Sequence, residues 1–391
     1  MTDLFTEGGK PGVPLPTPDA GYGPALRPGQ RLRALEVRQV LAAGGSTTVY
    51  GAHDSLSGQP VVIKEYLPQM LALRLPDGQV QPRAPEVAAL YGRGLQAFLN
   101  EARVLMNVDH PALVKVLQFW EQAGTAYQVL PRAQGSTLQQ WLAGLGTPPS
   151  EIWLRELLAP LMQALEALHR QGAHHGDLSL QSIWLQFENR ADSYLGQKPR
   201  PLLLGFGAAG RALAPPSASA AAALPGGFGP VELLDGAITV RQGAWTDVYA
   251  LCAVLYAAIC GRPPPPSLAR MARDDMVSAR KVGHGRYSPS FLAAIDAGLA
   301  VRPQDRVQSV AALRQLLDEP VSSFRAHSAS ALAAARAAVS AGRSAMTAPM
   351  SLADVPPPPA RNGAPMPSWA WSAALGALLL LLALLAAWVR G

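Results

Sequence analysis

The order of strand and helix signals along this chain most constrains its fold. Segments with the composition of strands come first, and the turn residues Ser57-Gly58 separate the last two of them. Apolar residues at helical spacing follow, beginning near Gly94 and again over 151–170. Strands that precede helices are typical of an α+β domain, which we expect over about 33–318. The predicted strands are 33–41, 47–54 and 60–65.

The two ends of the chain differ from this globular middle. Residues 1–32 are rich in glycine and proline and bury too little apolar surface to become ordered, so we expect a disordered tail there. Residues 319–367 shift to alanine, serine and proline, a composition typical of a linker.

The last segment has the length and composition of a membrane-spanning helix. Residues 369–389 carry no charge, and about 20 apolar residues are enough to cross the hydrocarbon core of a bilayer. Trp369 and Trp371 lie at one end and Trp388 at the other, and tryptophan prefers both membrane interfaces. The alternative is a buried core helix. We expect a transmembrane helix at 368–390 that contacts lipid through 369–389 and leaves the bulk of the chain in the cytoplasm.

Charge and cysteine content argue against two kinds of site. The net charge of +6 comes from arginines spread along the chain, whereas surfaces that follow nucleic-acid phosphates carry clustered cations. We therefore expect no nucleic acid among the partners. Cys252 and Cys260 lie in one apolar stretch, which favours buried reduced thiols over a disulfide or a metal site.

A lysine in the third predicted strand has an acidic candidate partner further along the chain. Lys64 follows Val61-Val62-Ile63, and Glu101 lies in the first helical run. Lysine is scarce here while arginine is plentiful, which indicates that a compact charge is needed at this point. Each residue alone reads as an ordinary surface charge, but the two together, in this order, are more specific.

These and later segments resemble, in their order, the motifs of bacterial Hanks-type serine/threonine protein kinases. The loop with Asp177 is similar to the catalytic loop of the family, and Gly205-Phe206-Gly207 is similar to its Asp-Phe-Gly motif. The resemblance covers 33–318. It implies the two-lobed kinase fold, with a small β-rich N-lobe over 33–130 and a larger helical C-lobe over 133–318.

The resemblance also implies a role for each matching residue. Lys64 and Glu101 correspond to the pair that positions the phosphates of ATP, and Asp177 corresponds to the catalytic base. Further contacts with ATP are implied for Gly44 and Val49 of a degenerate glycine-rich loop and for Leu130 at the hinge between the lobes. Structural roles are implied for Glu232, Arg306 and Asp247.

Both positions that hold magnesium in this family are altered. Ser182 replaces the asparagine of the catalytic loop, and Gly205 replaces the aspartate of Asp-Phe-Gly. Magnesium prefers hard oxygen ligands with a carboxylate among them, whereas serine offers a neutral oxygen and glycine offers no side chain. Gly176 also replaces the arginine of the catalytic loop. We therefore expect no magnesium site, while ATP stays a candidate ligand.

Three functional hypotheses follow from the altered motifs. The leading one is a pseudokinase, held in the inner (cytoplasmic) membrane by its tail anchor, that acts in signalling by binding protein partners and ATP. The alternative is an active serine/threonine protein kinase with atypical metal coordination, whose substrates are proteins at the membrane. The second alternative is a scaffold without nucleotide. The sequence identifies no individual partner.

Overall fold

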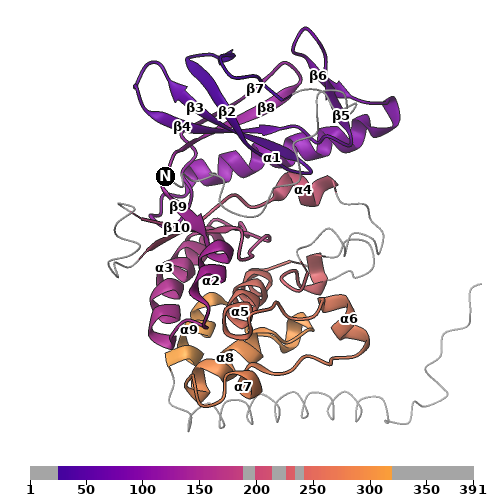
Figure 1. The fold of residues 1–391 in the computed structure, drawn as a ribbon. Coiled ribbons are helices and arrows are strands. Elements are labelled where there is room, and N and C mark those ends of the chain that lie inside the picture. The colour runs from indigo at the N-terminus through magenta and orange to yellow at the C-terminus, as the bar shows by residue number, and fades with distance from the viewer. Residues whose placement is uncertain (1–24, 188–198, 214–225, 234–241, 319–391) are drawn as a thin grey trace, which may run out of the picture. The chain divides into compact units, whose positions relative to one another are not determined.

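The computed structural model describes residues 25–187, 199–213, 226–233 and 242–318, and all structural statements refer to these. Their first part is a six-stranded antiparallel sheet with the order β1-β2-β3-β4-β8-β7, drawn at the top of Figure 1. The strands are β1 (Arg31–Leu32), β2 (Leu35–Ala43), β3 (Thr47–Asp54), β4 (Pro60–Tyr66), β7 (Gln118–Gln122) and β8 (Thr125–Pro131).

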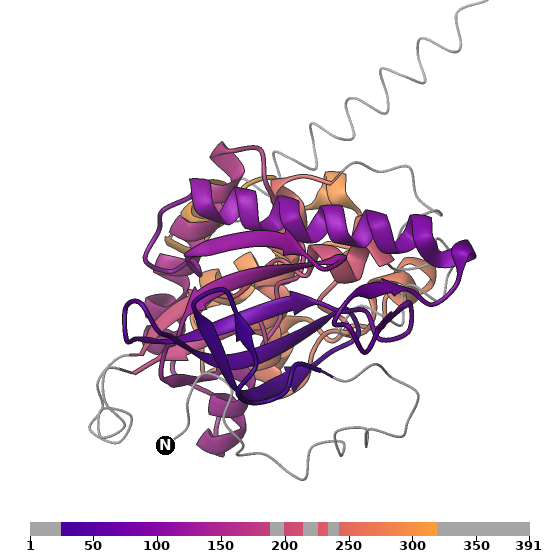
Figure 2. The ribbon, with the colours of Figure 1, turned by 90° about the horizontal axis from the view of Figure 1, so that it is seen from above.

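One long helix, α1 (Ala88–Asn107), packs on a face of this sheet, as Figures 1 and 2 show from two sides. Its apolar residues recur at helical spacing, so that one face is buried. Between β4 and α1 the chain forms a small hairpin of β5 (Ala72–Arg74) and β6 (Val80–Pro82), followed by the 3-10 helix η1 (Pro85–Val87).

The second part of the described chain is mostly helical and is built around α5 (Ala244–Cys260). Side chains on all sides of α5 are buried, because a helix that is apolar all round must be surrounded by other elements. A three-stranded sheet with the order β11-β10-β9 also belongs to this part. The other elements are β9 (Gly135–Thr137), α2 (Leu138–Leu145), α3 (Glu151–Arg170), β10 (Ile183–Gln186), β11 (Arg200–Leu203), α4 (Ala208–Leu213), η4 (Val231–Leu233), α6 (Ser267–Ala272), α7 (Ala279–Val282), α8 (Pro289–Gly298), η5 (Pro303–Asp305) and α9 (Val310–Asp318).

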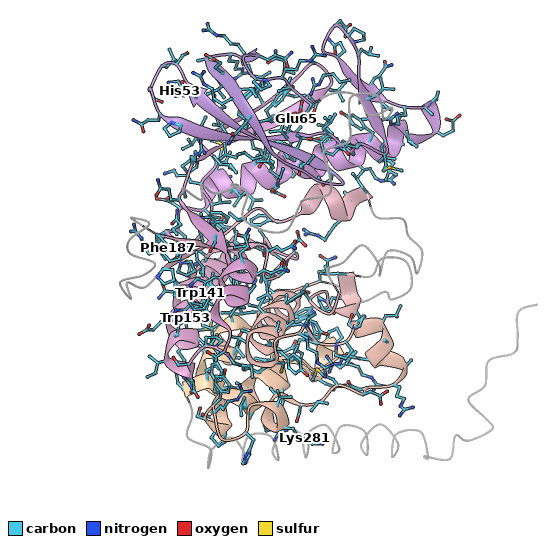
Figure 3. The ribbon with its side chains drawn as sticks, viewed as in Figure 1. His53, Glu65, Trp141, Trp153, Phe187 and Lys281 are labelled. Atoms are coloured by element: carbon cyan, nitrogen blue, oxygen red, sulfur yellow. The ribbon has the colours of Figure 1, made fainter. Side chains whose placement is uncertain are left out.

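Two tryptophans join α2 to α3. The rings of Trp141 and Trp153 are stacked with their centroids 4.1 Å apart, and Figure 3 shows them side by side on the two helices. Stacked aromatic pairs stabilise a contact beyond the area that they bury. This contact fixes α2 to the start of the long helix that precedes the loop with Asp177.

Most predicted elements lie where the sequence analysis expects them, with shifted ends. β3 and α3 coincide with the segments predicted at 47–54 and 151–170, whereas α1 starts earlier than Gly94. The folded domain also begins before residue 33. Leu26 is buried, and its N–H donates a hydrogen bond of 3.2 Å to the Tyr50 hydroxyl.

The expected disordered tail 1–32 is therefore folded from residue 25, because its last residues pack onto the sheet. The predicted linker 319–367 and transmembrane helix 368–390 lie outside the described residues. Among the helices that are described, none combines the length and the apolar character needed to cross a bilayer.

A buried ion pair connects η4 to the loop before α9. Arg306 Nη1 lies 2.6 Å from Glu232 Oε1, and both side chains are fully buried. The Thr246 hydroxyl donates to the same carboxylate at 3.0 Å, and the guanidinium donates to three backbone carbonyls, those of Ala300, Val301 and Trp245. The structure thus brings together two of the three residues to which the resemblance assigns a structural role.

Breaking this pair should destabilise the domain strongly. We expect Glu232→Gln to lower the free energy of unfolding by about 3–5 kcal/mol, because the charge of Arg306 then stays buried without a counter-charge. Urea denaturation measures this change. Asp275→Asn is the matched control, since Asp275 pairs with Arg273 on the surface and such pairs contribute little. Equal stability of Glu232→Gln and the control would contradict this account.

Candidate functional site

Lys64 of β4 and Glu101 of α1 form a direct ion pair. The distance from Lys64 Nζ to Glu101 Oε1 is 2.8 Å, and the glutamate side chain is only 1% exposed. The ammonium group also lies 5.5 Å from the centre of the Phe98 ring, which offers a cation–π contact. The strand and the helix therefore bring together the two residues that the sequence pairs.

Glu65, which the sequence analysis did not single out, carries a second buried charge on the same strand. It accepts a hydrogen bond of 2.6 Å from the Tyr50 hydroxyl and forms an ion pair with Arg74 of β5; Figure 3 labels it within the sheet. Burial, together with the charge of Glu65, raises the pKa of Tyr50. Consecutive strand residues point to opposite faces, so two adjacent charges in a buried strand indicate two separate partners.

The residues expected near adenine and phosphates lie on the strands around Lys64 or in the turn between β2 and β3. The N–H of Gly44 donates to the Thr47 carbonyl at 2.8 Å and closes the turn between β2 and β3. Val49 of β3 is paired with Lys64, and Leu130 of β8 is paired with Val62 on the other side of β4. Both apolar side chains pack on the core cluster that continues into the helical part.

Asp247 holds the loop that precedes Asp177. Its carboxylate accepts the backbone N–H groups of His175 and Gly176 at 2.9 and 2.8 Å and lies 2.7 Å from His169 Nε2. Burial by itself would raise the pKa of Asp247, but the hydrogen bond from His169 and the neighbouring donors hold that pKa below its usual value. Asp247 therefore fixes the backbone from which the candidate base projects.

Asp177 lies against the turn at Gly207. A Cβ at position 207 would lie 2.0 Å from Asp177 Oδ2, and Gly207 has a φ of +59°, so both space and backbone conformation favour glycine there. Burial raises the pKa of Asp177 to about 6. The charges of Arg211 and Lys64 oppose this rise, whereas that of Glu101 adds to it.

Ser182 uses its hydroxyl within the loop. Its Oγ accepts the Ser179 N–H at 2.9 Å and lies 3.2 Å from the Ser179 carbonyl, to which it donates. The Ser179 hydroxyl in turn accepts the N–H groups of Gln181 and Ser182 at 3.3 Å. The oxygen at the expected metal position thus stabilises the backbone of its own loop.

Gly205 leaves space that the ion pair fills. A Cβ at this position would lie 2.5 Å from Glu101 Oε1 and 2.9 Å from Lys64 Nζ, which is closer than real Cβ atoms approach such groups. The following residues keep the turn: Phe206 is buried, and its ring meets that of His175 edge-on at 5.2 Å.

No cluster of three or more histidine, cysteine, aspartate or glutamate side chains forms a metal site within the described ranges. The two expected magnesium positions carry the engaged hydroxyl of Ser182 and the bare backbone of Gly205. The carboxylates near these positions are those of Asp177 and Glu101, and that of Glu101 is bound by Lys64. The residues present do not fit a pair of magnesium ions, because these ions need several free hard oxygen ligands.

The raised pKa of Asp177 predicts a pH-dependent penalty on stability. Between its unfolded value of about 4 and its folded value of about 6, only the unfolded chain releases the proton. Stability therefore falls as pH rises through this window, by up to about 3 kcal/mol, and the penalty is constant above it. The asparagine of Asp177→Asn cannot ionise. As pH rises from 4 to 7, the free energy of unfolding of this variant should therefore increase by that amount relative to the unsubstituted protein. Urea unfolding at each pH measures the difference, and a pH-independent difference would refute the shift.

The chain matches the protein kinase domain over residues 35–320. The serine/threonine-protein kinase pkn2 of Myxococcus xanthus is 28% identical over 273 residues, which cover 69% of this chain and 30% of that protein. The DNA damage-responsive serine/threonine-protein kinase RqkA of Deinococcus radiodurans is 29% identical over 248 residues, which cover 61% of this chain and 32% of that protein. The chain thus spans about a third of the length of these curated relatives.

A solved structure, the apo form of PpkA-294, is 35% identical, with a TM-score of 0.66 and coverage of 75% of this chain and 99% of that one. The match to the kinase domain extends over most of the chain. In the structure Lys64 forms an ion pair with Glu101, and Glu232 forms one with Arg306, as the motifs require. The chain belongs to the protein kinase family and has its two-lobed fold.

Proposed function

We propose that this protein is a pseudokinase, which binds nucleotide and protein partners but does not transfer phosphate. The observation that carries the proposal is the environment of Gly205. At the position of the missing aspartate there is no side chain, and the ends of Lys64 and Glu101 lie within 3 Å of the place where a Cβ would be. Kinase catalysis depends on electrostatic stabilisation by magnesium, and the site lacks the carboxylate that would hold it.

The intact upper half of the site supports nucleotide binding. Lys64 is oriented by Glu101, and 17% of its side chain stays exposed, so its ammonium group is available to phosphate oxygens as a point charge. A solved structure of the same fold, Rad53 1-466, is a complex with AMP-PNP; at 18% identity and a TM-score of 0.53 it shows the fold alone. ATP bound without a firm need for magnesium is the ligand that this half of the site favours.

An assay with labelled ATP tests the loss of catalysis. With Mg²⁺ or Mn²⁺ and a general protein substrate, the full chain should transfer no more label than its Asp177→Ala variant. ATP should raise the midpoint of thermal unfolding equally with Mg²⁺ and with EDTA, since no carboxylate at position 205 couples metal to nucleotide.

Label transfer that Asp177→Ala abolishes would refute the pseudokinase proposal and favour an active kinase with atypical metal coordination. A thermal shift that appears with Mg²⁺ and disappears with EDTA would refute the metal argument. Absence of any shift with ATP would favour the scaffold without nucleotide.

We further propose that residues 368–390 anchor the protein in the inner (cytoplasmic) membrane, on the basis of their uncharged sequence and terminal tryptophans. The kinase domain then meets its partners at the membrane surface. The full chain should sediment with membranes after alkaline extraction and be released by detergent, whereas a chain that ends at residue 367 should stay in the supernatant. Equal distribution of the two chains would contradict the anchor.

A further inference from the structure

A buried glutamine on β8 reaches α1 next to the ion pair of Lys64. Gln128 is 1% exposed and is paired with Lys64 across β4 and β8, so the two side chains are neighbours on one face of the sheet. The side-chain amide of Gln128 donates a hydrogen bond of 3.0 Å to the Phe98 carbonyl of α1. Glu101, which binds Lys64, lies three residues further along this helix. Two neighbouring residues of the sheet therefore hold two neighbouring positions of α1.

A tyrosine of β4 fixes α1 at a second point. The Tyr66 hydroxyl donates to the Tyr91 carbonyl at 2.8 Å, and its ring contacts those of Tyr91 and Phe98, with centroids 5.1 and 5.9 Å away. Gly94 allows this approach, because a Cβ there would clash with the Tyr66 hydroxyl. Tyr91 and Phe98 are about two helical turns apart on one face of α1. Bonds at two such points oppose both sliding and rotation of the helix on the sheet (Figures 1 and 2).

Packing alone does not account for an amide at position 128. Burial of an amide is unfavourable unless it is hydrogen-bonded, and an apolar side chain of similar volume would fill the same space. The Phe98 carbonyl can accept the amide in addition to its bond within the helix, because a carbonyl oxygen has two lone pairs. If α1 moved away, the buried amide would lose this partner, which is costly. Gln128 therefore favours the arrangement in which Glu101 lies next to Lys64.

We infer that Gln128 is a positioning residue for Lys64, the residue that binds the nucleotide phosphates. Together with Tyr66 it fixes α1 on the sheet, so that the ion pair of Lys64 and Glu101 is formed before any ligand binds. The inference rests on the nucleotide site of the proposed function. The apparent Kd of a ligand equals its intrinsic Kd divided by the fraction of molecules in the binding-competent arrangement. A bond that keeps this fraction near one keeps the Kd for ATP low.

Replacement of the amide by an apolar group of similar volume tests this role. In the full chain in detergent micelles, with EDTA, Gln128→Met should raise the Kd for ATP about tenfold, because the buried bond to α1 is lost. The Kd for adenosine should stay unchanged, since adenosine has no phosphates for Lys64 to bind. Isothermal titration calorimetry measures both constants. Gln81→Met, at an exposed glutamine of β6, is the matched control and should change neither.

The second point of attachment provides a milder variant. Tyr66→Phe removes the hydroxyl that binds the Tyr91 carbonyl and keeps the ring that packs on α1. It should raise the Kd for ATP about threefold, again without an effect on adenosine. Because the apolar packing stays, this variant tests the inference even where Gln128→Met does not fold.

Hydrogen exchange without nucleotide reports the position of Glu101 directly. The N–H of Ala208 donates to Glu101 Oε2 at 3.1 Å, so this amide is protected only while the carboxylate is in place. In Gln128→Met it should exchange about tenfold faster than in the unsubstituted protein, whereas in Gln81→Met its exchange should not change.

The outcomes separate this inference from the proposed function. An unchanged Kd for ATP in both variants, or equal losses of affinity for ATP and adenosine, would overturn the role of Gln128 while leaving the nucleotide site in place. Unchanged exchange at Ala208 would show that Gln128 does not fix α1, and would also overturn it. Absence of ATP binding by the unsubstituted protein would instead refute the nucleotide site, and faster exchange at Ala208 in Gln128→Met would then still support the fixation of α1.

Discussion

The carboxylate of Glu101 is the group on which the arrangement of the site depends. One oxygen binds Lys64 at 2.8 Å, and the other accepts the Ala208 N–H at 3.1 Å. Because the side chain is only 1% exposed, water does not compete for either bond, and each bond orients the carboxylate for the other. The side chain of Glu101, on α1, therefore connects this helix to β4 and α4. A displacement of any of the three elements would disturb one of its two bonds.

Gly205 and Gly176 differ from the residues that the family has at these positions in side-chain volume as well as in chemistry. Gly205 lacks the carboxylate that binds metal in active kinases, and the ends of the Lys64 and Glu101 side chains lie within 3 Å of the place where its Cβ would be. Gly176 lacks a cation, and the guanidinium of Arg211 lies over it. In both places the charged end of another side chain lies within 3.5 Å of the position that a Cβ would take.

The long elements could be predicted from the sequence, whereas the short ones could not. α3 carries a helical pattern over its whole length, and the order of the motifs was enough to pair Lys64 with Glu101. β5 and β6 have three residues each, too few for a period to be recognised. α4 is equally short, and its partners Gly94 and Gly176 lie far away in the chain. Its position follows from tertiary packing alone.

In the catalytic loop, Ser182 is likewise engaged by its neighbours. Its hydroxyl holds the Ser179 backbone, so an asparagine there must either replace these bonds or leave a backbone donor without a partner, which is costly when buried. An aspartate at position 205 requires the ends of the Lys64 and Glu101 side chains to shift. Each reversion disturbs a bonded arrangement before it can bind metal, and neither alone restores the two-ion site. Recovery of metal binding therefore requires both the bonds of the Ser182 hydroxyl and the side chains around Gly205 to rearrange.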